Sequence, residues 1–165
     1  MNDENTKMEN VLSSFERQSN DATVIEFARG GWSVPPGGHL QGIQRMREYF
    51  IISASSDHEA YFIVIGQTPD GYNIVQRKII SRDPYRHAGG IQIIGDYLVV
   101  GIEDNVERDR SRVCFFDMTN PEEPLGDPII TIQREGERKR ATAGAVAVVK
   151  RAAEHLLIAG SWDSD

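Results

Sequence analysis

The sequence predicts an all-β protein that begins with one short helix and continues as repeated four-stranded units. Two observations lead to this expectation. After residue 22, short runs of β-branched and aromatic residues alternate with clusters of Gly, Pro, Asp and Asn. Two of these runs then recur at an offset of 48 residues, the separation of His39 and His87. With 165 residues, of which 39% are hydrophobic, the chain is long and apolar enough to bury a core of its own.

The N-terminal segment, residues 1–22, is predicted to contain a short amphipathic helix. Met8, Val11, Leu12 and Phe15 follow the spacing i, i+3, i+4 and i+7, which places them on one helical face. Thr6 to Glu9 matches a capping box, and the polar run 19–21 ends the helix. The β-rich part of the chain is therefore 23–165.

Eleven strands are expected in the β-rich part, each bounded by turn-forming residues. The runs are Val24–Phe27, Gly42–Met46, Tyr49–Ser53, Tyr61–Ile65, Tyr72–Ile80, Gly90–Ile94, Tyr97–Ile102, Arg112–Met118, Ile129–Gln133, Gly144–Val149 and His155–Ala159. Between the fourth and fifth runs, Thr68-Pro69-Asp70-Gly71 is a strong hairpin turn.

The repeat defines units at about 39–86, 87–140 and, partially, 141–165. In the first two units a His-containing turn and a Gly-led strand precede a strand that begins with Tyr49 or Tyr97. A weaker third copy starts near Gly144. Periods of about 50 residues with four short strands are typical of β-propeller blades, because one blade cannot bury both of its faces alone. The sequence thus predicts four-stranded antiparallel blades whose innermost strands are Gly42–Met46 and Gly90–Ile94.

The predicted propeller is incomplete, with about two whole blades plus partial ones. Val24–Phe27 is expected to be the last strand of a preceding blade, and in a closed ring it would join the sheet of the C-terminal strands. Because an open ring exposes apolar blade faces, the chain is expected either to form a homo-oligomer or to be the remainder of a longer chain.

One blade resembles propeller repeats of the LVIVD type. The passages Tyr97–Asp104 and Arg112–Pro124 carry the likeness: an apolar strand ends at Asp117, and Pro121 and Pro124 follow. The first unit departs from this pattern, since it lacks the Asp and the paired prolines. The resemblance implies a fold and no particular activity, because such repeats serve many functions.

Candidate site residues gather where propeller geometry brings loops to one rim, around the central axis. The entry loops supply His39, Gln41 and His87, and the loops between second and third strands supply Asp57, Glu103 and Asp104. His39 and His87 are candidate metal ligands, because imidazoles at equivalent positions near one axis suit a divalent metal. The alternative is that each His hydrogen-bonds the backbone of its turn, and Ala141, at the corresponding place in the third copy, breaks the pattern.

The formal net charge of −7 argues against nucleic acid and anionic membrane surfaces as partners. Neither a signal peptide nor an apolar run long enough to span a membrane is visible, so a cytoplasmic location is the default expectation. The single cysteine, Cys114, lies in a β-run with no obvious base beside it, which favours buried packing over nucleophilic catalysis.

The expected function is a binding or interaction module that holds a small molecule or a protein ligand at the propeller rim. Two alternatives remain open at this stage. One is a metal-assisted lyase or hydrolase at the tunnel mouth, and the other is an inactive fragment of a larger propeller protein. No cofactor is certain, and the only one that the pattern suggests is a divalent metal.

Overall fold

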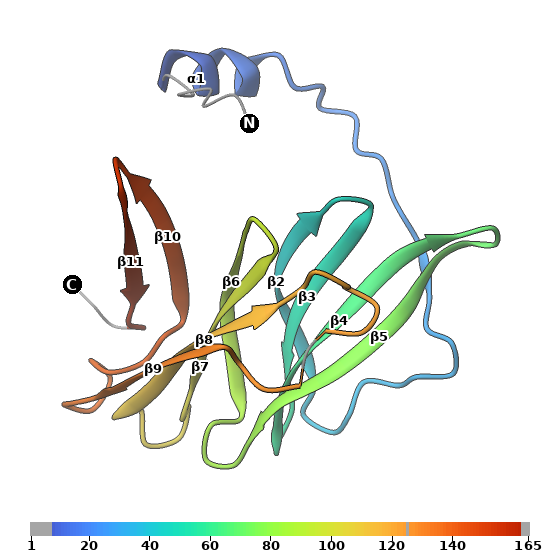
Figure 1. The fold of residues 1–165 in the computed structure, drawn as a ribbon. Coiled ribbons are helices and arrows are strands. Elements are labelled where there is room, and N and C mark those ends of the chain that lie inside the picture. The colour runs from blue at the N-terminus through green and yellow to red at the C-terminus, as the bar shows by residue number, and fades with distance from the viewer. Residues whose placement is uncertain (1–7, 125, 163–165) are drawn as a thin grey trace.

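A computed structural model describes residues 8–124 and 126–162, and within them it is all-β with one helix, as predicted. The strands form a five-stranded, a four-stranded and a two-stranded sheet, which stand side by side in Figure 1. The elements are α1 (Met8–Glu16), β1 (Phe27–Ala28), β2 (His39–Met46), β3 (Tyr49–Ser55), β4 (Glu59–Thr68), β5 (Gly71–Arg82), β6 (His87–Ile94), β7 (Tyr97–Glu103), β8 (Arg110–Asp117), β9 (Ile130–Glu135), β10 (Ala145–Arg151) and β11 (Glu154–Gly160).

The first sheet has the order β1-β5-β4-β3-β2. Its four long strands are antiparallel, and Thr68 pairs with Gly71 across the predicted two-residue turn. The expectation that residues 24–27 belong to the sheet of the C-terminal strands is wrong. Instead, Phe27 and Ala28 pair in parallel with Tyr72 and Asn73 on β5, because Phe27 packs against the apolar cluster on that face of the first sheet.

The second sheet is an antiparallel meander, β6-β7-β8-β9, and the third contains only β10 and β11 among the described residues. Asp117, the residue that ends β8, accepts hydrogen bonds from the amide and hydroxyl of Thr119, at 2.8 and 2.6 Å. These two bonds hold the pKa of Asp117 below its ordinary value. Pro121 and Pro124 are buried in the connection that follows, so this turn is fixed by its own side chains.

The pairing register repeats between the first two sheets. His39 pairs with Ser55 as His87 pairs with Glu103, and both ladders shift register after the next residue. Tyr49 and Tyr97 begin β3 and β7, as expected. The third hairpin keeps the same turn, since Ala152 has positive φ (52°) like Arg47 (54°). The β2–β3 and β6–β7 ladders therefore share one pairing pattern at the 48-residue offset.

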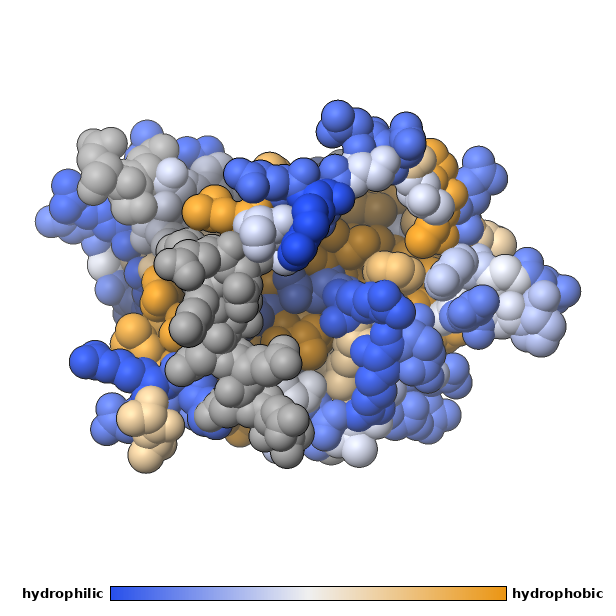
Figure 2. Space-filling model, turned by 90° about the horizontal axis from the view of Figure 1, so that it is seen from above, coloured by the Kyte–Doolittle hydropathy of each residue, from blue (hydrophilic) through white to orange (hydrophobic). Residues whose placement is uncertain are grey.

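The core lies between neighbouring sheets. Phe62 on β4 meets Phe116 on β8 with ring centroids 6.0 Å apart, inside a cluster that includes Ile51, Leu98 and the buried Cys114. A second cluster joins the second and third sheets. Seen from above in Figure 2, apolar side chains gather in a hollow that hydrophilic residues surround.

Strands β2, β6 and β10, one from each sheet, lie in a row with β6 in the middle. A Cβ on Gly42 would stand 3.2 Å from the Ile91 side chain, and the Gly90 amide donates to the Gly144 carbonyl at 2.8 Å. Buried side chains on β3 bridge the same seam: Ser53 Oγ donates to the Gly89 carbonyl at 2.8 Å. At Gly89 a Cβ would stand 2.8 Å from the Gly144 carbonyl oxygen, so the backbones approach too closely for a side chain there.

The predicted N-terminal helix is present as α1, while its capping box falls partly outside the described residues. Leu12 and Phe15 are 60% and 75% exposed, so the described part of the apolar face of α1 is not buried. Figure 1 shows α1 held away from the sheets by an extended segment. Within the described residues, no helix is long and apolar enough to cross a membrane.

Candidate functional site

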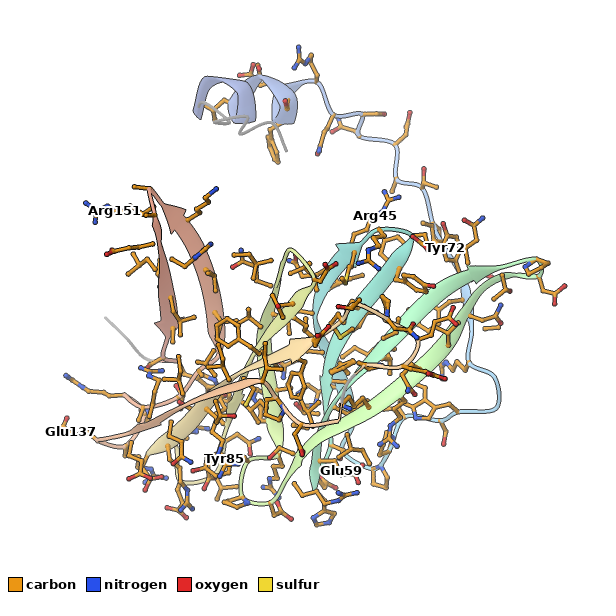
Figure 3. The ribbon with its side chains drawn as sticks, in the orientation of Figure 1. Arg45, Glu59, Tyr72, Tyr85, Glu137 and Arg151 are labelled. Carbon is orange, nitrogen blue, oxygen red and sulfur yellow. The ribbon has the colours of Figure 1, made fainter. Side chains whose placement is uncertain are left out.

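The candidate site lies where β2 and β6 begin and β3 and β7 end. This end of the molecule carries Glu59 and Tyr85 in Figure 3, opposite the end that carries Arg45 and Arg151. The antiparallel register places His39 and His87 there. The close approach of β2 and β6 then brings the two side chains together.

Four of the predicted residues meet at this end: His39, Gln41, His87 and Glu103. The rings of His39 and His87 are 5.6 Å apart, centroid to centroid. Between them lies the side-chain amide nitrogen of Gln41, 2.7 Å from His39 Nε2 and 2.5 Å from His87 Nε2. Because an amide NH₂ has two hydrogens, Gln41 can donate one to each ring.

Glu103 stands behind His87. Its Oε1 is 2.9 Å from His87 Nδ1, and its Oε2 accepts a hydrogen bond from the Ala143 amide at 2.6 Å. Glu103 is fully buried and His87 is 6% exposed. The ring N–H is poorly aligned with Oε1, so neither atom has a well-formed hydrogen bond. The carboxylate thus lies in contact with the imidazole on the side away from Gln41.

Trp162 completes the site from the third sheet. Its ring meets that of His87 edge to face at 5.4 Å, and the Arg108 guanidinium covers it at 4.7 Å. Gly144 makes room for this indole, because a Cβ there would stand 2.7 Å from Trp162 Cδ1. Gln41, His87 and Trp162 line a pocket of about 680 Å³ between the sheets.

The third sheet contributes threonine where the others have histidine. The Ala143 amide donates to Glu103 as the Ala88 amide donates to Ser55, so the residue that corresponds to His87 is Thr142. The spacing in the sequence predicts Ala141 at this place, one residue before the one that the hydrogen bonds identify. Thr142 Oγ1 accepts a hydrogen bond from the Trp162 amide at 2.9 Å, and it thereby helps to position the indole.

The two predicted aspartates have other contacts. Asp57 lies against Gly37, where its Oδ1 fills the space of a side chain. Asp104 is buried, and its Oδ1 caps the amides of Val106 and Glu107 while its Oδ2 binds Arg110 through two nitrogens, at 3.0 and 2.8 Å. Asp104 therefore orders the β7–β8 loop.

The pKa of Asp104 reflects these contacts. Burial alone would raise it, but the hydrogen bonds from Arg110 and from the amides of Glu107 and Val106 outweigh burial and hold the pKa below its ordinary value. At Cys114, burial dominates and raises the pKa of the thiol, with Thr131 3.8 Å away. A buried thiol of raised pKa is inert, which agrees with the packing role predicted for it.

Among the described residues, no three His, Cys, Asp or Glu side chains form a group that could hold a metal ion. His39 and His87 could supply two nitrogen ligands, while the Gln41 atom between them is an amide nitrogen, which donates hydrogen bonds and does not bind metal ions. Neither Asp57 nor Asp104 joins them. A metal here would need water or a bound molecule to complete its coordination.

Sequence reasoning missed Thr142 and Arg108 as parts of the site. Thr142 carries no repeated signal, because the third copy is displaced by its longer connection. Arg108 is one of several arginines on a charged loop, and only folding brings it over Trp162. No pattern in the sequence distinguishes it from the others.

No match to the chain was found among protein-family models, curated proteins or solved structures. The site is therefore interpreted from its own geometry.

Proposed function

We propose that the three sheets are successive blades of a propeller-type protein, and that the pocket at their shared end binds a small polar molecule. The repeated register and the adjacent first strands support the blade arrangement. The LVIVD-like passages agree with it.

The observation that carries the binding proposal is the convergence of Gln41, His87 and Trp162 on one pocket of about 680 Å³. This volume lies within the range of about 300–1,000 Å³ that is usual for small-molecule sites. An aromatic face beside a few polar groups is the usual composition of such a pocket.

The lining also indicates the chemistry of the ligand. Trp162 offers the side of its indole that lines the pocket for stacking against a sugar or another ring. Gln41 offers its side-chain carbonyl oxygen as a hydrogen-bond acceptor, because its NH₂ group is engaged with the two histidines. Arg108 places positive charge beside the indole. A molecule that combines a ring with hydroxyl or carboxylate groups would satisfy all of these contacts.

A saturation-transfer NMR screen of monosaccharides, nucleosides and small carboxylic acids tests the proposal. At least one class should bind, and Trp162→Ala and Gln41→Ala should each weaken that binding at least about tenfold, the loss of roughly 1.4 kcal/mol. His58→Ala is the matched control, because His58 is exposed and contacts Asp83 away from the pocket. Binding that survives Trp162→Ala unchanged would contradict the proposal.

A further inference from the structure

We infer that a divalent transition-metal ion of the Zn²⁺ class binds at the edge of this pocket, held by His39 Nε2 and His87 Nε2 at the point that the Gln41 amide now occupies. The inference rests on the proposed function, because the ion would lie beside the same pocket and could bind the pocket's ligand directly.

The first argument is the convergence of two ligand atoms. Both Nε2 atoms face one point, at 2.7 and 2.5 Å from the Gln41 nitrogen. Zn–N bonds are about 2.0–2.1 Å long, so each ring would need to move by only about 0.5 Å toward an ion at that point. The two strands β2 and β6 that carry the rings already lie together.

The second argument concerns the other nitrogen of each ring. His39 Nδ1 is 3.3 Å from the Gly37 carbonyl oxygen, and His87 Nδ1 is 2.9 Å from the Glu103 carboxylate. Histidines that bind metals almost always turn their second nitrogen to a carbonyl or a carboxylate. Both rings thus have an acceptor at Nδ1, which leaves the lone pair of each Nε2 directed at the shared point.

The third argument is the surroundings of Glu103. This side chain is fully buried; its Oε2 accepts from the Ala143 amide, while its Oε1 faces His87 Nδ1 without a well-formed hydrogen bond. A buried polar atom without a partner is costly. An ion on Nε2 would keep the proton of His87 on Nδ1, where a small turn of the ring lets it be donated to Oε1.

Gln41 can leave the metal position without disturbing the core, because its residue is exposed. In the metal-free protein its amide donates to both rings and keeps their spacing. When the ion binds, the side chain turns away and water or the pocket ligand completes the coordination shell. Glu103 is then a positioning residue, since it touches His87 and not the ion.

Isothermal titration of the full chain with Zn²⁺, after treatment with a chelator, tests the inference. One ion should bind per chain. His39→Ala and His87→Ala should each weaken binding at least about tenfold, and Glu103→Gln should weaken it by about 10–100-fold, the usual effect of losing an outer partner. Because His87 and Glu103 are buried, the melting temperature of each metal-free variant is measured as well, and the exposed His39→Ala keeps the test valid if His87→Ala fails to fold.

The chain provides matched controls in its other two histidines. His58→Ala and His155→Ala should leave the Zn²⁺ affinity unchanged, because both side chains lie away from the converging rings. Co²⁺ supplies a spectroscopic signal. The wild type should show d–d absorption, His39→Ala should lose this absorption, and Glu103→Gln should shift its wavelength. Equal Zn²⁺ affinity in the wild type and His39→Ala would overturn the inference, as would the absence of a Co²⁺ signal.

The experiments distinguish failure of the metal inference from failure of the small-molecule proposal. If the chelator-treated protein binds an organic molecule through Trp162 but takes up no Zn²⁺, the pocket is a ligand site without metal and only the inference is wrong. If Zn²⁺ binds through both histidines while no organic molecule binds, the small-molecule proposal fails and the metal site stands.

Discussion

His39 and His87 hold matching positions in the pairing of β2 and β6 but have different surroundings. His39 is exposed and touches its own turn through the Gly37 carbonyl, as the alternative interpretation of the sequence expected. His87 is buried and faces Glu103. Equivalent positions have therefore kept the direction of Nε2 while changing the acceptor at Nδ1.

We expect both rings, in their neutral form, to carry the proton on Nδ1. The acceptors beside Nδ1 and the amide donor beside Nε2 all favour this tautomer. Long-range ¹H–¹⁵N NMR of the imidazoles distinguishes it from the Nε2–H form. Gln41→Ala should shift the Nε2 signals of both rings and leave that of His58 unchanged, and an Nε2–H pattern in His87 would contradict the hydrogen-bond network described here.

The sequence could identify Glu103 and Asp104 as rim residues but not separate their roles. Side chains of adjacent strand residues point to opposite faces, so only one of the two can face the site. Which one does so depends on the register of β6 against β7, where His87 pairs with Glu103. Asp104 faces the loop instead and is used there by Arg110.

Replacing Asp104 by Asn should lower the free energy of unfolding at neutral pH by about 1–3 kcal/mol, the usual effect of leaving a buried polar group without a partner. The folded-state pKa lies below the ordinary value of 3.8, so the contribution of the carboxylate is present above pH 3.8 and is lost as the pH falls through the folded value. The difference between the wild type and Asp104→Asn should therefore vanish in acid. Urea unfolding at pH 7 and at a pH below the folded-state pKa measures it, and a difference that persists at the lower pH would contradict this cause.

At the scale of strands, most of the fold follows from local pattern. The alternation of β-rich runs with turn residues correctly predicted β2, β3, β6 and β7. The place of β1 could not be found this way. A two-residue strand has no periodicity, and its parallel pairing with β5 depends on the packing of Phe27 in the folded sheet.

Gly101 on β7 shows how closely the second and third sheets approach. A Cβ at this position would stand 2.1 Å from the Ala143 carbonyl oxygen, whereas the equivalent Ser53 has room for a side chain. Gly101→Ala should therefore lower the free energy of unfolding by at least about 1–3 kcal/mol, the usual cost of overpacking, since the obstacle is backbone.

Thermal unfolding of Gly101→Ala beside Gly136→Ala makes the comparison. At Gly136 a Cβ would meet the Ala141 side chain at an ordinary 3.6 Å, so this control should keep the wild-type stability within about 1 kcal/mol. Equal melting temperatures for the two variants would mean that Gly101 and the Ala143 carbonyl lie farther apart than in the structure.

At the scale of the whole molecule, the outer face of β10 and β11 exposes apolar side chains to water. Val148 and Leu157 point toward the second sheet and pack there. On the other face Val149, Leu156 and Ile158 are 48%, 52% and 49% exposed, and β11 pairs with no strand but β10 among the described residues. An apolar strand with a free edge is a template for association with another chain.

We therefore expect the 165-residue chain to self-associate through this face, so that multi-angle light scattering gives a mass above 18.5 kDa that rises with concentration. Leu156→Lys combined with Ile158→Lys should return the mass to that of the monomer, because two charges on the face oppose its burial. Leu12→Lys is the control: Leu12 is also exposed, at 60%, but lies on α1, away from the sheets, so the change should leave association intact. A wild type that stays at 18.5 kDa at every concentration would contradict self-association and would mean that the outer face of β10 and β11 is stable in water without a partner.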